Sequence, residues 1–521
     1  MPQPPSAPKS SRSSVGGLLL RLLGLAFIDA LALLLAYALV GNGLWPAAIA
    51  LVVVTIAINW IFLDERLYPV RWLSPGLLMM LLMVVYPLLF TVYVALTNYG
   101  DGHLLSKEQV VRQFTTQHYQ PPDAVVYQTT VYMSADGAFL LVFTDPKTNT
   151  RLAGTADEIL KPIDATGDLP GALKDSTGKE YSKVEAMKTL RLLDRLTKIP
   201  FSDGTNVVQV TGMGKASQRK PAYAFDPATD QLTDNRTGVV YKPVKGTFTA
   251  PDGKTLSPGY HVMIGFENYL RVVKDPNIRS PFLRVFVWTF LFAAFSVLLT
   301  FVVGLSMAVV LNDKSLPFRG LFRTLIIIPY AIPAIISTLI WRGLLNPNYG
   351  QFSGLIKGVF GTSPQWFIDP FWAKAGILLI NTWLGYPYMM LICLGALQSI
   401  PGDMFEAADI DGAGKWLQFR KLTLPLLLVS IAPLLIGTFA FNFNNFGLIE
   451  AYNKGGPPIA GEATPAGQTD ILISYTFRLA FGSGAGADYG LASAIALFIF
   501  LLVGGLTMLN FRYTRQLEEV T

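Results

Sequence analysis

The chain has 521 residues, of which 51% are hydrophobic and only 15% are charged, and its mean hydropathy is +0.42. Soluble proteins carry a charge on about a quarter of their residues. This composition therefore excludes an ordinary soluble protein and indicates a membrane protein. The formal net charge of +6 does not require a nucleic-acid partner, because the basic residues gather in short segments between apolar runs.

Long apolar runs recur along the chain. Because the hydrocarbon core of a bilayer takes about 20 residues at helical rise, runs of about 18 or more apolar residues predict spanning helices. On this criterion the sequence predicts an α-helical polytopic membrane protein with about eight transmembrane helices. The predicted spans cover residues 15–40, 45–63, 74–98, 282–311, 321–345, 371–399, 422–452 and 489–511.

The character of the chain changes between the third and fourth spans. Residues 99–280 are polar and contain short alternating runs such as VVYQTTVY and TNVVQVTG, separated by Asp-Gly and Pro-Gly turn signals. Their β-branched and aromatic content is typical of strands. A segment of roughly 180 residues is large enough for a core of its own. We therefore expect a β-rich domain inserted between helices 3 and 4, rather than a disordered loop.

Basic residues indicate the orientation of the spans. If the spans simply alternate, every Lys and Arg cluster falls on one side, which the positive-inside rule assigns to the cytoplasm. Both termini are then cytoplasmic and the inserted domain is extracytoplasmic. A cleavable signal peptide is the alternative for the first span, although its apolar run is long and another span follows at once. The clustered residues are Lys9, Arg12, Arg21, Arg66, Arg71, Lys314, Arg319, Arg323, Lys415, Arg420, Lys421, Arg512 and Arg515.

The expected organisation follows directly. A cytoplasmic tail covers residues 1–14, three spans lie within 15–98, the extracytoplasmic domain covers 99–280, and a core at 281–521 carries the remaining spans. The only cysteine, Cys393, lies in the sixth span. No disulfide within the chain can therefore stabilise the outer domain.

Several enzymatic chemistries are absent. A phosphate-binding loop needs a glycine five residues before the glycine of its Gly-Lys pair, and Ser or Thr after the lysine. Neither Gly414-Lys415 nor Gly214-Lys215 meets this pattern. No Cys or His spacing indicates a metal site, and no G-x-S-x-G nucleophile elbow is present. Within the late spans, Asp, Glu, Lys, Arg and His are absent from residues 285–311, 324–341, 375–401 and 422–449, which argues against a proton-driven carrier. A sodium site made of carbonyls and amides stays open, and Asp29 in the first span is an exception to the lack of charge.

The loop at 401–425 separates the sixth and seventh spans and ends in EAADIDGAGKWLQFRKLTLP. Asp403 and Glu406 fit an Asp version of the capping box, which predicts a short helix beginning there. Gly412 and Gly414 then interrupt this helix, and an amphipathic run along the membrane surface follows. The residues alone leave two interpretations open, a docking element for another protein and an ordinary capped loop.

The spacing of this loop resembles the signature loop of binding-protein-dependent ABC importer permeases. In that family the loop is a coupling helix that seats in a cleft on a separate ATPase subunit. The resemblance implies that ATP and Mg bind to the partner ATPase, that this chain holds no cofactor and is no enzyme itself, and that Glu406 is its main charged contact. The signature positions are filled by Glu406, Ala407, Ala408, Asp411, Gly412, Ala413, Leu424 and Pro425.

Other motifs narrow the resemblance to sugar-type permeases. IGFENYLRVVKDP at 264–276 and NKGGP at 453–457 are similar to segments around their core spans. The large insert after the third span resembles the permeases of maltose/maltodextrin importers. The resemblance implies a type I ABC importer permease core in the lipid bilayer of the cytoplasmic (inner) membrane. It also implies four partners: a second, shorter MalG-like permease, a MalK-like ATPase dimer, an extracytoplasmic maltose/maltodextrin-binding protein, and maltose or maltodextrin.

Polar and aromatic residues in three late spans are candidate substrate contacts. In the sixth and seventh spans they recur at i, i+4 and i+7 and so share a helical face. Rings and neutral amides suit a sugar, whose CH faces lie on rings while its hydroxyls meet donors and acceptors. Tyr330 lies between Pro329 and Pro333, where the helix must be irregular. The candidates are Tyr330, Asn381, Gly385, Tyr388, Phe441, Asn442 and Asn445.

Alternatives stay open at this point. These polar residues also fit a purely structural role, because Asn and Thr often bond helix to helix in membranes. Ala334 and Thr438 stand where the maltose-type relatives are expected to carry serines, which leaves another oligosaccharide open as the substrate. A membrane-anchored sensor or enzyme, acting through the outer domain, is a third reading.

Overall fold

The computed structural model describes residues 15–42, 45–163, 167–203, 207–313, 315–462, 464–482 and 486–518. By residue contacts the chain forms two compact units, residues 1–91 and 92–521. The predicted tail at 1–14 and Lys314 lie outside the described residues.

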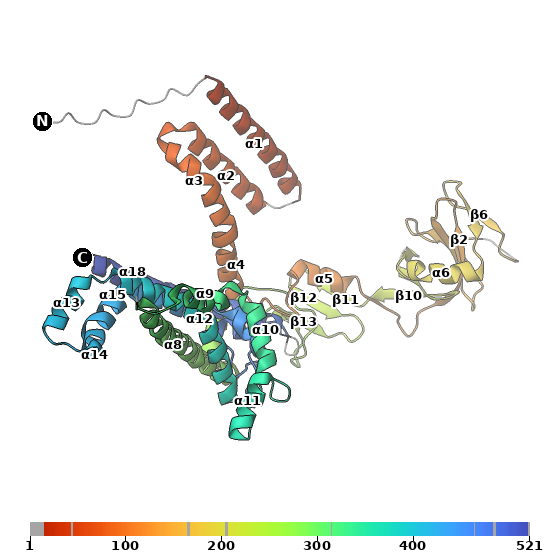
Figure 1. Ribbon diagram of the computed structural model, residues 1–521. Helices are drawn as coiled ribbons and strands as arrows, with labels where there is room; N and C mark the ends of the chain where they lie inside the picture. Colours follow the sequence, from red (N-terminus) through yellow and green to blue (C-terminus); the bar gives the residue numbers. More distant parts are fainter. Residues whose placement is uncertain are drawn as a thin grey trace. The chain divides into compact units, whose positions relative to one another are not determined.

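The first unit is a bundle of apolar helices (red to orange in Figure 1). A polar contact in the apolar region joins the first two helices, where the Asn59 amide donates to the Asp29 carboxylate at 2.6 Å. A polar partner of this kind offsets the cost of a carboxylate at membrane depth. At the turn, Arg71 donates to the backbone carbonyls of Ile61 and Asp64. The helices are α1 (Val15–Gly41), α2 (Trp45–Leu63), α3 (Tyr68–Met80) and, after a π-helical turn, α4 (Tyr86–Ala95), which continues into the second unit.

The second unit contains a helical core built around two long helices, α8 and α12. Small residues let these two helices approach closely, since a Cβ on Gly304 of α8 would lie only 2.8 Å from the backbone nitrogen of Met390 on α12. The core helices are α7 (Glu267–Lys274), α8 (Pro276–Asn312), α9 (Arg319–Ala331), α10 (Ala334–Leu344), α11 (Gln351–Phe360), α12 (Pro370–Ser399), α13 (Gly402–Ile410), α14 (Lys415–Gln418), α15 (Leu424–Phe443), α16 (Phe446–Asn453), α17 (Leu472–Phe481) and α18 (Tyr489–Glu518).

The helices account for the predicted spans. Among the described residues, six helices are long and apolar enough to cross a membrane: 19–41, 68–95, 276–312, 370–399, 415–443 and 489–508. A bent pair, α9 with α10, would make a seventh, and the apolar helix at 47–63 is shorter. Each predicted span therefore corresponds to a helical element, and the multi-pass helical fold is confirmed.

Two predicted spans differ in detail from the structure. The fifth, at 321–345, is not one helix but two, which meet at an angle of 93°. Ile332 and Pro333 form the break, because proline lacks the amide hydrogen that would continue the helix and pushes the preceding residue out of the helical region. The seventh, at 422–452, ends at Phe443, and a separate helix α16 follows.

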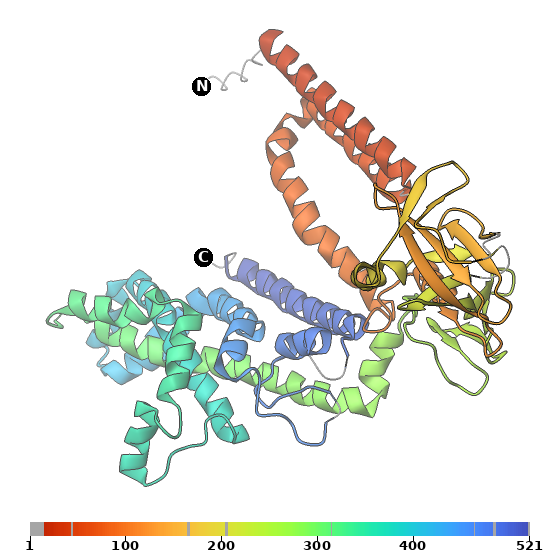
Figure 2. The ribbon, with the colours of Figure 1, turned by 90° about the vertical axis from the view of Figure 1, so that its right-hand side faces the viewer.

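The inserted domain is β-rich, as predicted, and has two lobes (Figures 1 and 2). One lobe holds a ten-stranded sheet with α6 (Ala186–Leu196), and the other a four-stranded sheet with α5 (Lys107–Thr115). The strands are β1 (His118–Tyr119), β2 (Val126–Met133), β3 (Phe139–Thr144), β4 (Arg151–Thr155), β5 (Lys161–Pro162), β6 (Ala172–Lys174), β7 (Glu180–Lys183), β8 (Pro200–Ser202), β9 (Val207–Gly212), β10 (Lys215–Pro221), β11 (Tyr223–Asp226), β12 (Gln231–Asp234), β13 (Val240–Val244) and β14 (Thr247–Thr249).

Each lobe has its own core. In the larger sheet, β3 is buried on both faces: Leu141 and Phe143 belong to one apolar cluster, and Leu140 and Val142 belong to another. The smaller lobe has a separate cluster that joins α5 to β11–β14 around Phe248. These cores explain how the outer domain is stable without a disulfide.

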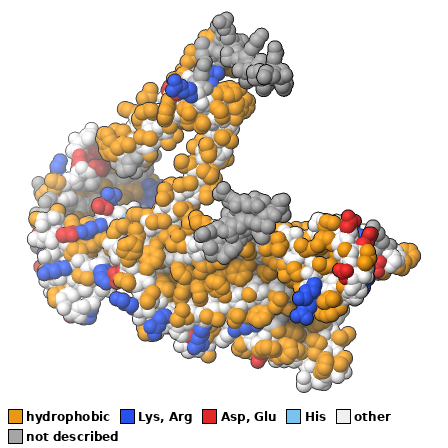
Figure 3. All heavy atoms as spheres, turned by 90° about the vertical axis from the view of Figure 1, so that its left-hand side faces the viewer, with side chains coloured by type: hydrophobic (Ala, Val, Ile, Leu, Met, Phe, Trp, Pro, Cys, Tyr) orange, Lys and Arg blue, Asp and Glu red, His pale blue; other side chains and the backbone are white. Residues whose placement is uncertain are grey.

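The surface of the helical region is strongly apolar. Figure 3 shows hydrophobic side chains over most of the visible face, with Lys and Arg gathered toward its edges. On α8 alone, Leu283, Val287, Leu291 and Leu298 are each at least 44% exposed. A surface of this kind is stable only in contact with lipid or with another membrane helix.

Candidate functional site

The loop between α12 and α15 contains the predicted short helix, α13, but it begins earlier than expected. Pro401 is its N-cap and Gly402 its first residue, and no side chain caps the end. The predicted capping box at Asp403 and Glu406 is therefore wrong. Asp403 lies instead in the first turn, where a carboxylate still interacts favourably with the helix dipole.

A glycine-dependent turn ends α13. The amide of Ala413 donates to the Ala408 carbonyl at 2.9 Å, and that of Gly412 donates to the Asp409 carbonyl at 3.1 Å. These two bonds form a Schellman motif, which requires a left-handed residue after the C-cap. Gly412 supplies it with φ +75°. The geometry thus gives a physical reason for glycine at this position of the EAA signature.

A polar latch, formed by Asp409, Lys415 and Gln418, fixes the path of the chain after this turn. The buried Gln418 amide donates to the Asp409 carboxylate at 2.5 Å and to the Ala413 carbonyl at 2.8 Å. Lys415 pairs with the same carboxylate at 3.1 Å. The hydrogen bond from Gln418, and then that from Lys415, lower the pKa of Asp409. The sequence did not predict this latch, because Lys415 and Gln418 follow Asp409 by six and nine residues, across the turn that ends the helix.

The predicted coupling residues lie on an exposed element. No residue of α13 is buried, and Ile410 at its end is 87% exposed. Trp416 in α14 is 73% exposed. The amphipathic run predicted to lie along the membrane surface instead begins the helix that continues into α15. Glu406, Ala407, Asp411 and Gly412 are all exposed, and Ala408 is partly so.

Two candidate substrate residues pair with each other between spans. The Asn381 amide on α12 donates to the Asn442 side-chain oxygen on α15 at 2.7 Å. Asn442 in turn donates to the Thr438 carbonyl at 2.8 Å. Both asparagines are about 5% exposed or less. In this conformation they bond one helix to another, which is the structural role given above as the alternative to a substrate contact.

Gly385 has a packing role. A Cβ at this position would lie 2.8 Å from Cγ2 of Thr300 on α8. The glycine therefore permits the close crossing of α8 and α12, one helical turn from Asn381.

Three aromatic candidates remain accessible. Tyr330, next to the break between α9 and α10, stacks with Tyr388 on α12, with ring centroids 6.3 Å apart and an interplanar angle of 16°. Their exposed fractions are 57% and 38%, and that of Phe441 is 68%. Rings presented in this way can contact the CH faces of a sugar. The stacked pair brings together residues 58 positions apart in the sequence.

Asn445 does not continue the face of Thr438 and Asn442. The helix ends at Phe443, and Asn445 is the N-cap of α16, where its side chain accepts from the Leu448 amide at 3.4 Å. Asparagine favours this position because its side chain satisfies a free amide at the helix start. The prediction of a continuous i, i+4, i+7 face on this span is wrong at its last member.

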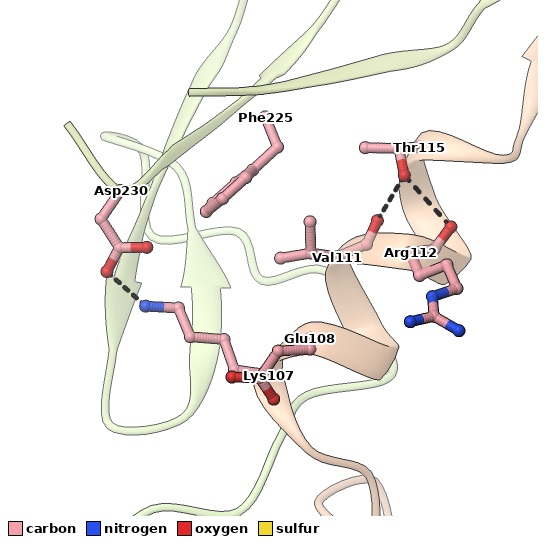
Figure 4. Close-up of a pocket in the computed structure, with 7 residues that line it drawn as sticks. All are labelled: Lys107, Glu108, Val111, Arg112, Thr115, Phe225 and Asp230. Atoms are coloured by element: carbon pink, nitrogen blue, oxygen red, sulfur yellow. Dashed lines mark hydrogen bonds and ion pairs between the residues drawn. The ribbon is translucent and has the colours of Figure 1, made fainter. Parts of the chain in front are cut away.

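The outer domain contains a pocket beside α5. A pocket of about 430 Å³ lies between α5 and β11–β12, with Phe225 and Val111 as its apolar wall and an ion pair between Lys107 and Asp230 at its edge (Figure 4). Within the described part of the chain, no group of three or more metal-ligating side chains is found.

Comparison with known proteins identifies the family of this chain. Two family models match: "N-terminal of TM subunit in PBP-dependent ABC transporters" over residues 78–157, and "Binding-protein-dependent transport system inner membrane component" over residues 300–515. The second match includes the EAA loop and every candidate substrate residue. The matches confirm the resemblance to ABC importer permeases.

Three relatives match nearly the whole chain, and each is named maltose/maltodextrin transport system permease protein MalF. The Vibrio vulnificus protein is 38% identical over 98% of this chain and 96% of its own length. The Vibrio cholerae protein is 40% identical over 91% of this chain and 90% of its own length. The Salmonella typhimurium protein is 39% identical over 94% of this chain and 96% of its own length. This chain therefore belongs to the MalF family of ABC transporter permeases and is a multi-pass membrane subunit of a transport system, not an enzyme.

Proposed function

We propose that the chain is a translocating subunit of an ATP-driven importer for maltose and maltodextrins in the cytoplasmic membrane, with both termini in the cytoplasm. The observation that carries this proposal is identity of 38–40% with maltose/maltodextrin permeases over nearly the whole length. The likeness includes the outer domain as well as the core spans.

The proposed partners follow from the family and from exposed elements. A MalK-like ATPase dimer, which binds ATP and Mg, would receive α13, because a short helix with no buried residue gains its stability from a docking surface. A MalG-like second permease would cover part of the exposed apolar surface of the core spans. An extracytoplasmic sugar-binding protein would deliver the substrate on the side of the outer domain.

In the proposed mechanism, closure of the ATPase dimer pushes on α13 and tilts the core spans. The sugar then meets the stacked Tyr330 and Tyr388 rings and Phe441. The Asn381–Asn442 pair lies between α12 and α15, so a movement of these helices would free two amides for sugar hydroxyls. The pair is thus compatible with both interpretations of these residues: it bonds two helices to each other in one state and contacts the substrate in another.

The test is ATPase activity of the assembled transporter in proteoliposomes, with and without the binding protein loaded with maltose or longer maltodextrins. Tyr388→Ala and Asn442→Ala are expected to lower the sugar-dependent stimulation several-fold while basal activity persists. Tyr37→Ala is the matched control, because Tyr37 is 83% exposed and lies on α1. Stimulation unchanged in both site variants would refute the proposed site.

The coupling role has its own test. Glu406→Ala is expected to abolish stimulation without loss of assembly, since its carboxylate is exposed on α13 and is the proposed charged contact to the ATPase. A Glu406→Ala transporter that keeps both stimulation and transport would contradict the proposal. If a different glycan stimulates the ATPase in a series of competing sugars, the proposed importer function stands and the proposed substrate is wrong.

A further inference from the structure

Helix α7 presents an apolar stripe that no described residue of the chain covers. Phe266, just before the helix, and Leu270 and Val273 within it are 72%, 50% and 63% exposed. They recur at i, i+4 and i+7 and therefore form one face. Met263, in the preceding turn, is 60% exposed and extends the stripe.

The opposite face of α7 is fixed to the ends of two spans. Asn268 is fully buried and donates to the carbonyls of Ala95 and Thr97, at 2.9 and 2.8 Å, where the third span ends. Arg271 pairs with Asp488 at 2.8 Å, immediately before the last span begins at Tyr489.

This joint allows no rotation of the helix. The oxygen of Asn268 accepts from Arg271 at 3.1 Å, so both polar side chains belong to one network. A Cβ on Gly490, at the start of the last span, would lie 2.8 Å from the Asn268 amide nitrogen and would contact the Thr97 carbonyl oxygen. The stripe is therefore held outward by contacts on the other side of the helix.

The joint also defines the depth of α7. Because apolar residues of α4 stop at Ala95 and those of α18 start at Tyr489, both helices meet the membrane surface at this level. Lys274 and Arg279 are exposed next to the stripe, and Tyr269 lies beside Phe266, with ring centroids 5.9 Å apart. Tyrosine and basic side chains are typical of the lipid headgroup region.

We propose that α7 is an interfacial helix, with Phe266, Leu270 and Val273 inserted among lipids at the membrane surface next to the outer domain. An amphipathic helix with a buried polar face and an exposed apolar face at this depth fits the boundary between headgroups and acyl chains. Leu283 and Val287 of the following helix, α8, are exposed as well, at 50% and 55%. Through Asn268 and Arg271, this lipid contact fixes the root of the outer domain at a constant depth.

The experiment uses the assembled transporter with Cys393, the only cysteine, replaced by alanine. Single cysteines at Phe266, Leu270 or Val273 carry an environment-sensitive fluorophore in vesicles of phosphatidylethanolamine and phosphatidylglycerol. Some vesicles also contain phosphatidylcholine brominated near the headgroup end or deep in the chain. Retained sugar-stimulated ATPase activity shows that each labelled transporter is folded, and the three positions substitute for one another if one fails to assemble.

Three control positions calibrate the result. Lys254→Cys on the outer domain reports water, since its side chain is 83% exposed, and Leu298→Cys on α8 reports the lipid interior. Glu267→Cys reports the polar side of α7. We expect the stripe positions to be quenched several-fold more by shallow bromolipid than Lys254→Cys or Glu267→Cys, and more by shallow than by deep bromine.

Two outcomes would overturn the proposal. If iodide in the buffer quenches the fluorophores on the stripe as strongly as the one at Lys254→Cys, the stripe faces water. Protection from both iodide and bromolipid, with crosslinking to the second permease, would show that a protein subunit covers it instead.

Discussion

Two loops of the permease core are built in opposite ways. The loop between α16 and α17 is organised around a fully buried carboxylate, Asp470, which receives the Arg478 guanidinium, the Ser474 hydroxyl at 2.7 Å and the Gly467 amide at 2.7 Å. The loop between α12 and α15 has no buried residue in α13 and is closed by the Schellman turn and the latch.

The difference shows which loop is complete on its own. In the α16–α17 loop the buried carboxylate has partners from the loop itself and from α17, and the Tyr452 hydroxyl of α16 donates to the carbonyl of Trp366, just before α12, at 2.8 Å. The α12–α15 loop instead exposes Ile410 and Trp416. An exposed apolar surface on a well-defined turn is suited to bind a partner protein. A buried ion pair with satisfied oxygens is suited to hold a loop rigid, as a fixed wall of the core.

The largest effect is expected at the buried pair. Asp470→Ala leaves Arg478, whose side chain is 18% exposed, without its main partner. Breaking a buried pair from one side costs about 3–5 kcal/mol. We therefore expect a sharp fall in thermal stability of the purified complex, measured by loss of monodisperse protein on heating.

A matched control is Asp194→Ala, which removes an i, i+4 partner of Lys198 on the surface of α6. Exposed pairs of this kind contribute about 0–1 kcal/mol, so its melting temperature should barely move. Equal melting temperatures for the two variants would mean that the α16–α17 loop is not a fixed wall.

A second comparison uses one isoleucine from each loop. Ile459 in the α16–α17 loop is 7% exposed and belongs to the core cluster of α8, α17 and α18. Ile459→Ala should cost about 2–5 kcal/mol of stability. Ile410→Ala, at a side chain that is 87% exposed, should change stability by about 0.5 kcal/mol or less.

In binding of the ATPase the order should reverse, with the larger effect for Ile410→Ala than for Ile459→Ala. Burial of an isoleucine by a partner contributes about 1.5–3 kcal/mol, so Ile410→Ala should weaken ATPase binding roughly tenfold. Association of the purified ATPase with the reconstituted permease measures this effect. Unchanged association would remove Ile410 from the docking surface.

A third effect is expected at the turn after α13. Gly412→Ala places a Cβ at φ +75°, which costs about 1–2 kcal/mol in the left-handed region. Sugar-stimulated ATPase activity should fall, because the direction of α13 depends on this turn. Gly414→Ala is the control, since Gly414 has φ −62° and needs no glycine; equal losses in both variants would argue against the turn as the cause.

These features also separate what the sequence predicts from what it leaves out. Helical spans and strand-rich lobes follow from local hydrophobic patterns, and the break after Gly412 follows from glycine itself. The Asp470–Arg478 pair does not, because a buried charge is recognisable only once the surrounding helices are in place. Asn445 shows the same limit: an i, i+4, i+7 pattern assumes an unbroken helix, whereas α15 ends at Phe443 and Asn445 begins the next helix as its N-cap.

The candidate site follows the same division. Asn381 and Asn442 were recognisable as polar residues facing inward from two spans, but the hydrogen bond that joins them depends on how α12 and α15 cross. Tyr330 stacks on Tyr388 from the end of α9, just before the 93° bend to α10. Prolines predict an irregular helix, but the direction of the bend is set by packing against α12.

The smallest effect concerns pH at the latch. The hydrogen bonds from Gln418 and Lys415 lower the pKa of Asp409 below its ordinary value. A carboxylate with a lowered pKa contributes its full stabilisation above the pKa of the unfolded chain, and loses it only as the pH falls through the lowered value. The contribution of the latch to stimulated ATPase activity should therefore stay constant between about pH 6 and pH 8.

Asp409→Asn tests this sign. Asparagine keeps an oxygen for Gln418 but cannot pair with Lys415, so activity should drop slightly and by the same factor at both ends of that range. A loss that grows toward acidic pH in the unsubstituted protein, and disappears in Asp409→Asn, would mean that Asp409 titrates near neutrality. The latch would then respond to pH, and the α12–α15 loop would be adjustable where the α16–α17 loop is fixed.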